Sequence, residues 1–223
     1  MALLALGACD VDDRVLTVAD GSDAPADVAI GARVIVVDTF EDGDLVPADA
    51  RFAPWTFSAY GPAGGLPDGA FATLSVETPG YGASQRALRL DWQVVRQAGD
   101  AGATSPGVLL GTSLPHDTID LNLFSHLVFE SQYQHQGDCK AVPVLTIVVR
   151  CAVYGASFES YLEMSPDWKV KTVPFSDLTS ATFGEPRPRC LGAFDALDLQ
   201  AQVNLADGEC ASGTLWLDDI RIE

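Results

Sequence analysis

The sequence predicts an all-β fold, an antiparallel β-sandwich of the jelly-roll type, and three observations support this. The apolar runs are short and rich in β-branched residues, and clusters of Gly, Pro, Asp and Ser separate them. Several runs alternate apolar and polar residues, as in ALRLDWQV at 87–94, which is the period of a strand with one buried face. Helical signals are nearly absent. Many short strands at this spacing are typical of a sandwich or a jelly roll.

The first expected strands lie between clear turn signals. Residues 33–38 (RVIVVD) are a β-branched run that ends at an acidic segment. Residues 55–60 (WTFSAY) and 71–76 (FATLSV) flank a stretch rich in Gly and Pro. Residues 86–94 show the clearest alternation of apolar and polar side chains, so we expect one buried and one exposed face there.

The later strands follow the same pattern of short apolar runs between turn clusters. We expect them at residues 107–112, 126–134, 142–150, 157–163, 168–175, 196–204 and 214–222. Residues 176–180 (SDLTS) have the composition of one helical turn, with Ser176 as its N-cap. The chain shows no internal repeat and no second apolar core, so residues 33–223, roughly 190 residues, are expected to form a single β-sandwich domain.

The N-terminal region has the composition of an export signal followed by a tether. Residues 1–9 are short and apolar, and LGAC at 6–9 resembles a bacterial lipobox, in which cleavage leaves an acylated Cys9. The usual basic segment is missing, so we expect a truncated signal peptide. Residues 10–32 are acidic, small and non-periodic, as in a flexible tether. We therefore expect a lipid anchor at Cys9 in the bacterial cell envelope, at the outer membrane, in the periplasm or at the cell surface.

The charge of the chain disfavours several classes of partner. The formal net charge is -18, from 31 acidic and 13 basic residues. Such a surface repels phosphate backbones, so we expect no nucleic-acid partner. It equally disfavours electrostatic docking on anionic lipid. The charge serves either solubility alone or an affinity for cations, and we expect a monomer.

Besides Cys9, the chain contains Cys139, Cys151, Cys190 and Cys210. An even number of cysteines behind an export signal favours two disulfides, and neither these spacings nor the scattered histidines match a zinc site. Strand directions alternate in an antiparallel sandwich, where a nine-residue strand is roughly 30 Å long, whereas a disulfide needs Cα atoms within about 7 Å. Counting strands along the chain predicts the pairs Cys139–Cys210 and Cys151–Cys190.

The order of several short motifs resembles that of known carbohydrate-binding modules. The motifs are DTFEDGD with a following PWTF, then ALRLDWQV, IDLNLFSHLVFESQYQ, DWKVKTVPFSDL and the closing LWLDDIRI. Together they resemble the carbohydrate-binding modules of the galactose-binding-like jelly-roll group over residues 33–223. The resemblance does not single out one family within that group.

Members of that group often carry a structural calcium between their first and last strands, so the resemblance implies one here. In the group's pattern the glutamate after the phenylalanine is a ligand and maps to Glu41, and the aspartate of the closing strand maps to Asp218, or to Asp219 if the strand is shifted by one residue. Calcium prefers about six to eight oxygen ligands, including backbone carbonyls. The carbonyl of Thr39, on the same side of an extended segment as Glu41, could supply one. The alternative is an acidic turn at 41–44, with both aspartates bonded to backbone.

Candidate glycan contacts lie on the polar faces of two expected strands. They are Arg89, Asp91 and Gln93 in the first strand, and Glu130, Gln132 and Gln134 in the second. We expect these six side chains either to line a concave sheet and bind sugar hydroxyl groups, or to form an ordinary solvated face. Tyr81, in the glycine-flanked loop TPGYGAS, is a further candidate because such a loop can lift a ring into a site.

The tryptophans divide into core and surface candidates. Trp92 shares a face with leucines and is expected in the core, as are Trp55 and Trp168. Trp216 points away from Leu215 and its apolar neighbours, so we expect it to be exposed or to lie under a loop.

No catalytic constellation is recognisable in the sequence. It lacks the G-x-S-x-G elbow of hydrolases, a phosphate-binding loop and a dinucleotide fingerprint, and among 31 acidic residues a pair of carboxylates arises by chance. We therefore expect a non-enzymatic, lipid-anchored extracytoplasmic protein whose β-sandwich binds a polysaccharide or another glycan. Two alternatives are an adhesion or scaffold module that binds protein partners without a sugar site, and a polysaccharide-active jelly-roll enzyme.

Overall fold

The computed structural model describes residues 33–60, 70–96, 106–151, 155–180 and 190–223. The expected signal at 1–9 with Cys9, and the expected tether at 10–32, lie outside the described residues. Within the described residues, no helix is long and apolar enough to cross a membrane.

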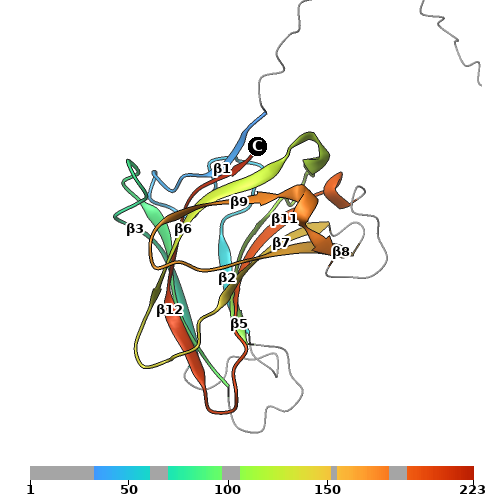
Figure 1. The fold of residues 1–223 in the computed structure, drawn as a ribbon. Helices are drawn as coiled ribbons and strands as arrows, with labels where there is room; N and C mark the ends of the chain where they lie inside the picture. The colour runs from blue at the N-terminus through green and yellow to red at the C-terminus, as the bar shows by residue number, and fades with distance from the viewer. Residues whose placement is uncertain (1–32, 61–69, 97–105, 152–154, 181–189) are drawn as a thin grey trace, which may run out of the picture. The chain divides into compact units, whose positions relative to one another are not determined.

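The described strands form two six-stranded antiparallel sheets (Figure 1). The first, named here the β12 sheet, has the order β3-β4-β12-β6-β9, with β1 paired to β12. Its strands are β1 (Ile35–Asp38), β3 (Phe71–Glu77), β4 (Ala87–Val95), β6 (His126–His135), β9 (Lys169–Pro174) and β12 (Cys210–Ile222). The second, the β11 sheet, has the order β10-β8-β7-β11-β5-β2. Its strands are β2 (Thr56–Tyr60), β5 (Gly107–Ser113), β7 (Val144–Cys151), β8 (Ala156–Leu162), β10 (Thr179–Ser180) and β11 (Ala196–Gln202). Two short 3₁₀ turns are η1 (Leu121–Leu123) and η3 (Phe175–Asp177). The architecture confirms the predicted all-β sandwich.

The apolar core forms because the strands alternate as the sequence predicts. In β4, Leu88, Leu90 and Trp92 are at most 1% exposed, while the polar residues between them lie on the opposite face. Trp55, at 3% exposed, is also in the core. Burying each such apolar side chain stabilises the fold by about 1.5–3 kcal/mol, so the alternation of the sequence fixes which face of each sheet meets the core.

The end of β12 is shared between two neighbouring strands. β4 pairs with residues 210–217 of β12. β1 pairs with residues 220–222 at the end of β12, with Ile35 opposite Ile222. Because β6 occupies the other edge of β12, β1 and β4 follow one another along a single edge. Figure 1 shows β1 beside the C-terminus of the chain. Asp218 and Asp219 fall in the gap between the two strands, where Asp219 has a left-handed φ of 46° and the register with β6 shifts, as at a β-bulge.

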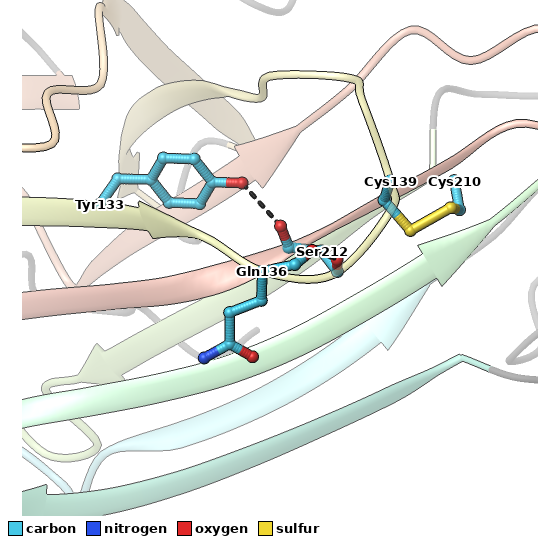
Figure 2. The surroundings of a disulfide bond; sticks show 5 residues. All are labelled: Tyr133, Gln136, Cys139, Cys210 and Ser212. Carbon is cyan, nitrogen blue, oxygen red and sulfur yellow. Dashed lines mark hydrogen bonds between the residues drawn. A yellow bond between two sulfur atoms is a disulfide. The ribbon is translucent and has the colours of Figure 1, made fainter.

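Two disulfides close long loops in the described domain. Cys139, after β6, bonds to Cys210 at the start of β12, with Cα atoms 5.0 Å apart (Figure 2). Cys151 at the end of β7 bonds to Cys190, with Cα atoms 5.3 Å apart. These are the two pairs that counting strand directions predicts.

Tyr133 of β6 packs against β12 beside the first disulfide. The Tyr133 hydroxyl donates a hydrogen bond of 2.9 Å to the carbonyl oxygen of Ser212 (Figure 2). Its ring lies over Gly213, where an added Cβ would stand 2.4 Å from the ring. Only glycine leaves room for the ring. β12 begins at Cys210 and includes Ser212 and Gly213, whereas the sequence predicts its start at 214.

The segment after β9 differs from the prediction. The expected turn at 176–180 is a 3₁₀ turn at Phe175–Asp177, and the residue in the N-cap position is Pro174. Ser176 is therefore not the cap. Thr179 and Ser180 instead form β10, which pairs with β8. A two-residue strand has no periodicity, so sequence patterns could not reveal it.

Candidate functional site

The polar residues predicted on β4 and β6 share the outer face of the β12 sheet, but β12 lies between the two strands. Thr214 is opposite Asp91 on one side and Gln134 on the other, and Trp216 is placed in the same way between Arg89 and Gln132. The predicted residues therefore flank β12. Trp216 lies at the centre of this face, and its side chain points away from the core, as the sequence predicts.

The polar side chains around Trp216 bond mainly to one another. The Arg89 guanidinium pairs with Glu77 at 2.7 Å and with Asp91 at 2.9 Å, and it stacks 5.2 Å from the centre of the Trp216 ring as a cation–π contact. The hydroxyl of Thr214 donates to the Asp91 carboxylate. Much of the hydrogen-bonding capacity of this face is therefore used within the protein, and one face of the aromatic ring is covered.

A second set of predicted residues meets where β1, β12 and the loop before β4 come together. They line a cavity of about 550 Å³, named here the junction cavity. Its wall consists of Thr39, Glu41, Tyr81, Gly82, Ala83, Ser84, Glu130, Asp218 and Asp219. The structure thus brings together the four predicted calcium ligands, and the same wall contains Tyr81 and Glu130, two of the predicted glycan contacts.

Hydrogen bonds already hold two of these carboxylates. Glu41 Oε1 accepts from the Ser84 hydroxyl at 2.5 Å and from the backbone N–H groups of Gln85 and Arg86 at 2.9 and 3.2 Å. These donors, the Ser84 hydroxyl foremost, hold the pKa of Glu41 below its usual range. Asp218 accepts from the backbone N–H of Tyr81 at 2.8 Å. The two carboxylates therefore fasten the loop that carries Tyr81.

Glu130 is the unsatisfied member of the cavity wall. Glu130 is 5% exposed, and its Oε2 atom has no hydrogen-bond partner among the described residues. Burial, followed by the negative charge of Asp219, raises the pKa of Glu130 to about 7, although Arg221 opposes the shift. Burial likewise raises the pKa of Asp218.

The donor types of the junction cavity fit calcium, whereas the carboxylates are not gathered around one point. Among the described residues, no three Asp, Glu, His or Cys side chains are grouped so that they could hold a metal ion. Three residues of the wall can offer oxygen ligands, namely Thr39 through its carbonyl and Glu41 and Asp218 through their carboxylates, and this is the chemistry that calcium prefers. The cavity wall contains no Lys, Arg or His side chain.

Trp168 corrects one prediction. The sequence predicts it in the core, but it is only half-buried, and its ring packs against Tyr81 with centroids 5.7 Å apart. The reason is its place just before β9, which is an edge strand. Tyr81, 36% exposed, and Trp168 together form an aromatic pair beside the junction cavity.

The outer face of the β11 sheet contains polar groups that sequence reasoning missed. In β7, Leu145, Ile147 and Val149 face the core, so Thr146 and Arg150 face outward. Arg150 makes a bidentate ion pair with another strand's aspartate on this face. That residue, Asp198 of β11, is 1% exposed and lies 2.7 Å (Oδ2) from Arg150 Nε and 2.9 Å (Oδ1) from Nη2.

Gly111 on β5 makes room for this ion pair, because an added Cβ would stand 2.3 Å from the Asp198 carboxylate. Burial raises the pKa of Asp198, and the Arg150 charge opposes the shift. The alternation in ALDLQAQ, with one aspartate and two glutamines on the polar face, is the sequence signal that could have identified this face.

A row of side chains crosses the β11 sheet beside the ion pair. Tyr161 of β8, Thr146 of β7 and Gln200 of β11 are opposite one another in register. Tyr161 is 57% exposed, whereas Thr146 is fully buried and its hydroxyl has no partner among the described residues. A cavity of about 610 Å³ opens at the Arg150 end of this face, and its wall consists of Ser113, Leu114, Arg150, Gly155, Ala156, Ser157, Asp195 and Ala196.

Comparison with known proteins identifies the fold. No protein-family model matches the chain, and no curated protein matches it. Among solved structures, the family 11 carbohydrate-binding module of a cellulosomal cellulase of Clostridium thermocellum aligns with a TM-score of 0.52 at 15% identity, over 86% of this chain and 94% of that one. An exo-β-agarase aligns with a TM-score of 0.51 at 15% identity, over 84% of this chain but 24% of the agarase chain. The protein therefore has the jelly-roll β-sandwich fold of carbohydrate-binding modules.

Proposed function

We propose that the protein binds a glycan, without cleaving it, on the outer face of the β11 sheet. The observation that carries the proposal is the row of Tyr161, Thr146 and Gln200 across neighbouring strands. Sugar recognition requires an aromatic surface for the C–H edges of the ring and fixed polar groups for its hydroxyls. This row supplies the exposed ring of Tyr161 and, one strand beyond Thr146, the partly exposed amide side chain of Gln200. The fold shared with carbohydrate-binding modules supports the proposal.

The outer face of the β12 sheet is the second candidate location. It contains five of the six predicted contacts, namely Arg89, Asp91, Gln93, Gln132 and Gln134, while the sixth, Glu130, lines the junction cavity. We favour the β11 sheet because the Arg89 guanidinium, held by Glu77 and Asp91, covers the Trp216 ring, whereas the Tyr161 ring is 57% exposed. A sugar would have to displace these contacts before it could bind.

The chemical class of the glycan on the β11 sheet follows from the charge. With a formal net charge of -18, the protein repels anionic polysaccharides over long distances. Neutral polysaccharides are therefore the proposed class.

Affinity electrophoresis in gels containing soluble polysaccharides tests both the function and its location. We expect a neutral polysaccharide to retard the protein and Tyr161→Ala to weaken binding about tenfold, as loss of one aromatic contact does. Gln132→Ala on the β12 sheet is the matched control and should bind like the wild type. Loss of retardation in the control with full retardation of Tyr161→Ala would place the site on the β12 sheet. The absence of retardation by any polysaccharide would favour the alternative of a protein-binding adhesion module.

The proposed absence of catalysis is tested separately. A retarding polysaccharide incubated with the protein should release no new reducing ends. Release of reducing ends that disappears on mutation of a carboxylate would instead support the polysaccharide-active alternative, which the partial likeness to an agarase keeps relevant.

We further propose a structural calcium in the junction cavity, held by the Thr39 carbonyl and the carboxylates of Glu41 and Asp218, with Asp219 in reach. An ion there would neutralise buried negative charge and fasten β1 to β12. Since a ligand that binds only the folded state stabilises it, millimolar calcium should raise the melting temperature of chelator-treated protein. An unchanged melting temperature would remove the calcium proposal without affecting the glycan site.

We also propose that a lipid on Cys9 anchors the protein. The lipobox-like LGAC at 6–9 supports a lipid on Cys9 and a place in the bacterial cell envelope. Cys9→Ser should yield protein in the soluble fraction of a bacterial expression host. A variant that remains in the membrane fraction would contradict this proposal.

A further inference from the structure

The junction cavity contains one feature that a structural calcium does not account for, namely the orphaned carboxylate of Glu130. Each of the other three acidic side chains in the wall has a partner. Glu41 accepts three hydrogen bonds, Asp218 accepts backbone N–H groups, and Asp219 lies 3.4 Å from the guanidinium of Arg221. Of these four acidic side chains, only Glu130 has an oxygen that is both buried and without a hydrogen-bond partner in the part of the chain that the structure describes. A buried carboxylate oxygen without a donor is costly, so a ligand that supplies a donor would bind there favourably.

The charge of the cavity indicates what kind of donor fits. The wall contains four acidic side chains and no basic one, and a divalent ion bound by Glu41 and Asp218 would offset two of the four charges. Glu130 and Asp219 would still face the cavity with the single guanidinium of Arg221 nearby. A positively charged hydrogen-bond donor suits this environment better than a neutral hydroxyl, because charge-assisted hydrogen bonds are about twice as strong as neutral ones.

The size of the cavity and its aromatic wall indicate what carries that charge. A volume of about 550 Å³ is far more than one metal ion occupies, and it is within the range of small-molecule sites. Tyr81 lines the cavity and packs on Trp168, so the rim offers an aromatic surface beside the acidic wall. The same loop contributes the small residues Gly82 and Ala83 to the wall, and an added Cβ at Gly82 would meet no atom within 4 Å. An acidic wall with an aromatic rim matches a ligand that has an ammonium group on a sugar-sized ring.

We propose that the junction cavity binds an amino sugar, with the ligand's ammonium group hydrogen-bonded to Glu130 and its ring against Tyr81. This site is separate from the neutral-glycan site on the β11 sheet, and the inference rests on the proposed function only in taking the ligand to be a saccharide. The protein would thereby recognise a glycan that contains both neutral and amine-bearing units.

The test is calorimetric titration in calcium-containing buffer near neutral pH, with two probes of equal length. A glucosamine oligomer carries the ammonium groups, and the corresponding N-acetylglucosamine oligomer lacks them. We expect the wild type to bind the glucosamine oligomer at least tenfold more tightly. Glu130→Gln, which keeps the shape of the side chain, should lose that preference, while Glu77→Gln, an acidic residue on β3 outside the cavity, should retain it. Equal affinity for the two oligomers, or an unchanged preference in Glu130→Gln, would overturn the proposal.

Two further measurements separate this inference from its alternatives. Lysine amide as a titrant reports an ammonium group without a sugar, and binding as tight as that of the glucosamine oligomer would show that the ring is not recognised and would overturn the amino-sugar assignment. Affinity electrophoresis with a neutral polysaccharide reports the β11 sheet alone, and Glu130→Gln should leave it unchanged. If the neutral polysaccharide fails to bind while the amine preference is present, the proposed function fails and this inference stands.

Discussion

Replacing Glu130 with glutamine should stabilise the protein at alkaline pH and leave it unchanged in acid. Burial raises the pKa of Glu130 to about 7 from the 4.5 of an ordinary glutamate. Ionising this group therefore costs roughly 3 kcal/mol more in the folded protein than in the unfolded chain. The penalty is absent below pH 4.5, grows as the pH rises toward 7 and is complete above it. Glutamine has nearly the same shape and no charge, so it escapes the penalty.

The measurement is urea unfolding of wild type and Glu130→Gln in chelator, at pH 4.5 and near pH 8.5. At the higher pH the variant should have the larger free energy of unfolding, by up to roughly 3 kcal/mol. At the lower pH the two proteins should differ by less than about 1 kcal/mol. Glu77→Gln, in which an exposed ion pair with Arg89 is lost, should change stability by at most about 1 kcal/mol at either pH. A variant that is less stable than wild type near pH 8.5, or a difference of the same size at both pH values, would refute the reasoning.

The remaining predictions concern the region around the first disulfide. The Cys139→Ser/Cys210→Ser double variant removes a cross-link between residues 71 apart in sequence. The chain-entropy relation gives a loss of about 4 kcal/mol in the free energy of unfolding. A loss under about 1 kcal/mol, measured by denaturant titration, would contradict this prediction. Gly213→Ala places a methyl group 2.4 Å from the Tyr133 ring and should lower the free energy of unfolding by about 1–3 kcal/mol. The melting temperature should therefore fall by several degrees. An unchanged melting temperature would contradict the claim that the ring position requires glycine.

Much of the fold could be predicted because strand alternation acts locally. The alternation in β4 fixes the buried face that contains Trp92, and the outward direction of Trp216 follows from the same rule. Strand counting was sufficient for both disulfides, since strand length separates the wrong partners by tens of ångströms. The pairing of β1 with β12 came from the resemblance and not from any local pattern.

The neighbours of each strand could not be predicted, and the candidate sites depend on them. Nothing in the sequence places β12 between β4 and β6, so the contact of Arg89 with Trp216 was not foreseen. Trp168 reads as a core residue until the structure places β9 at the edge of a sheet. Asp198 was overlooked because its environment is set by Arg150 and Gly111 on two other strands. Long-range register, which a sequence pattern does not contain, decides all three.

The central claim is that the outer face of the β11 sheet is the glycan-binding surface. Affinity electrophoresis of wild type, Tyr161→Ala and Gln132→Ala in one gel series with a neutral polysaccharide tests it most directly. The account predicts retardation of the wild type and Gln132→Ala, and about tenfold weaker binding by Tyr161→Ala. Equal retardation of all three proteins, or loss confined to Gln132→Ala, would contradict it.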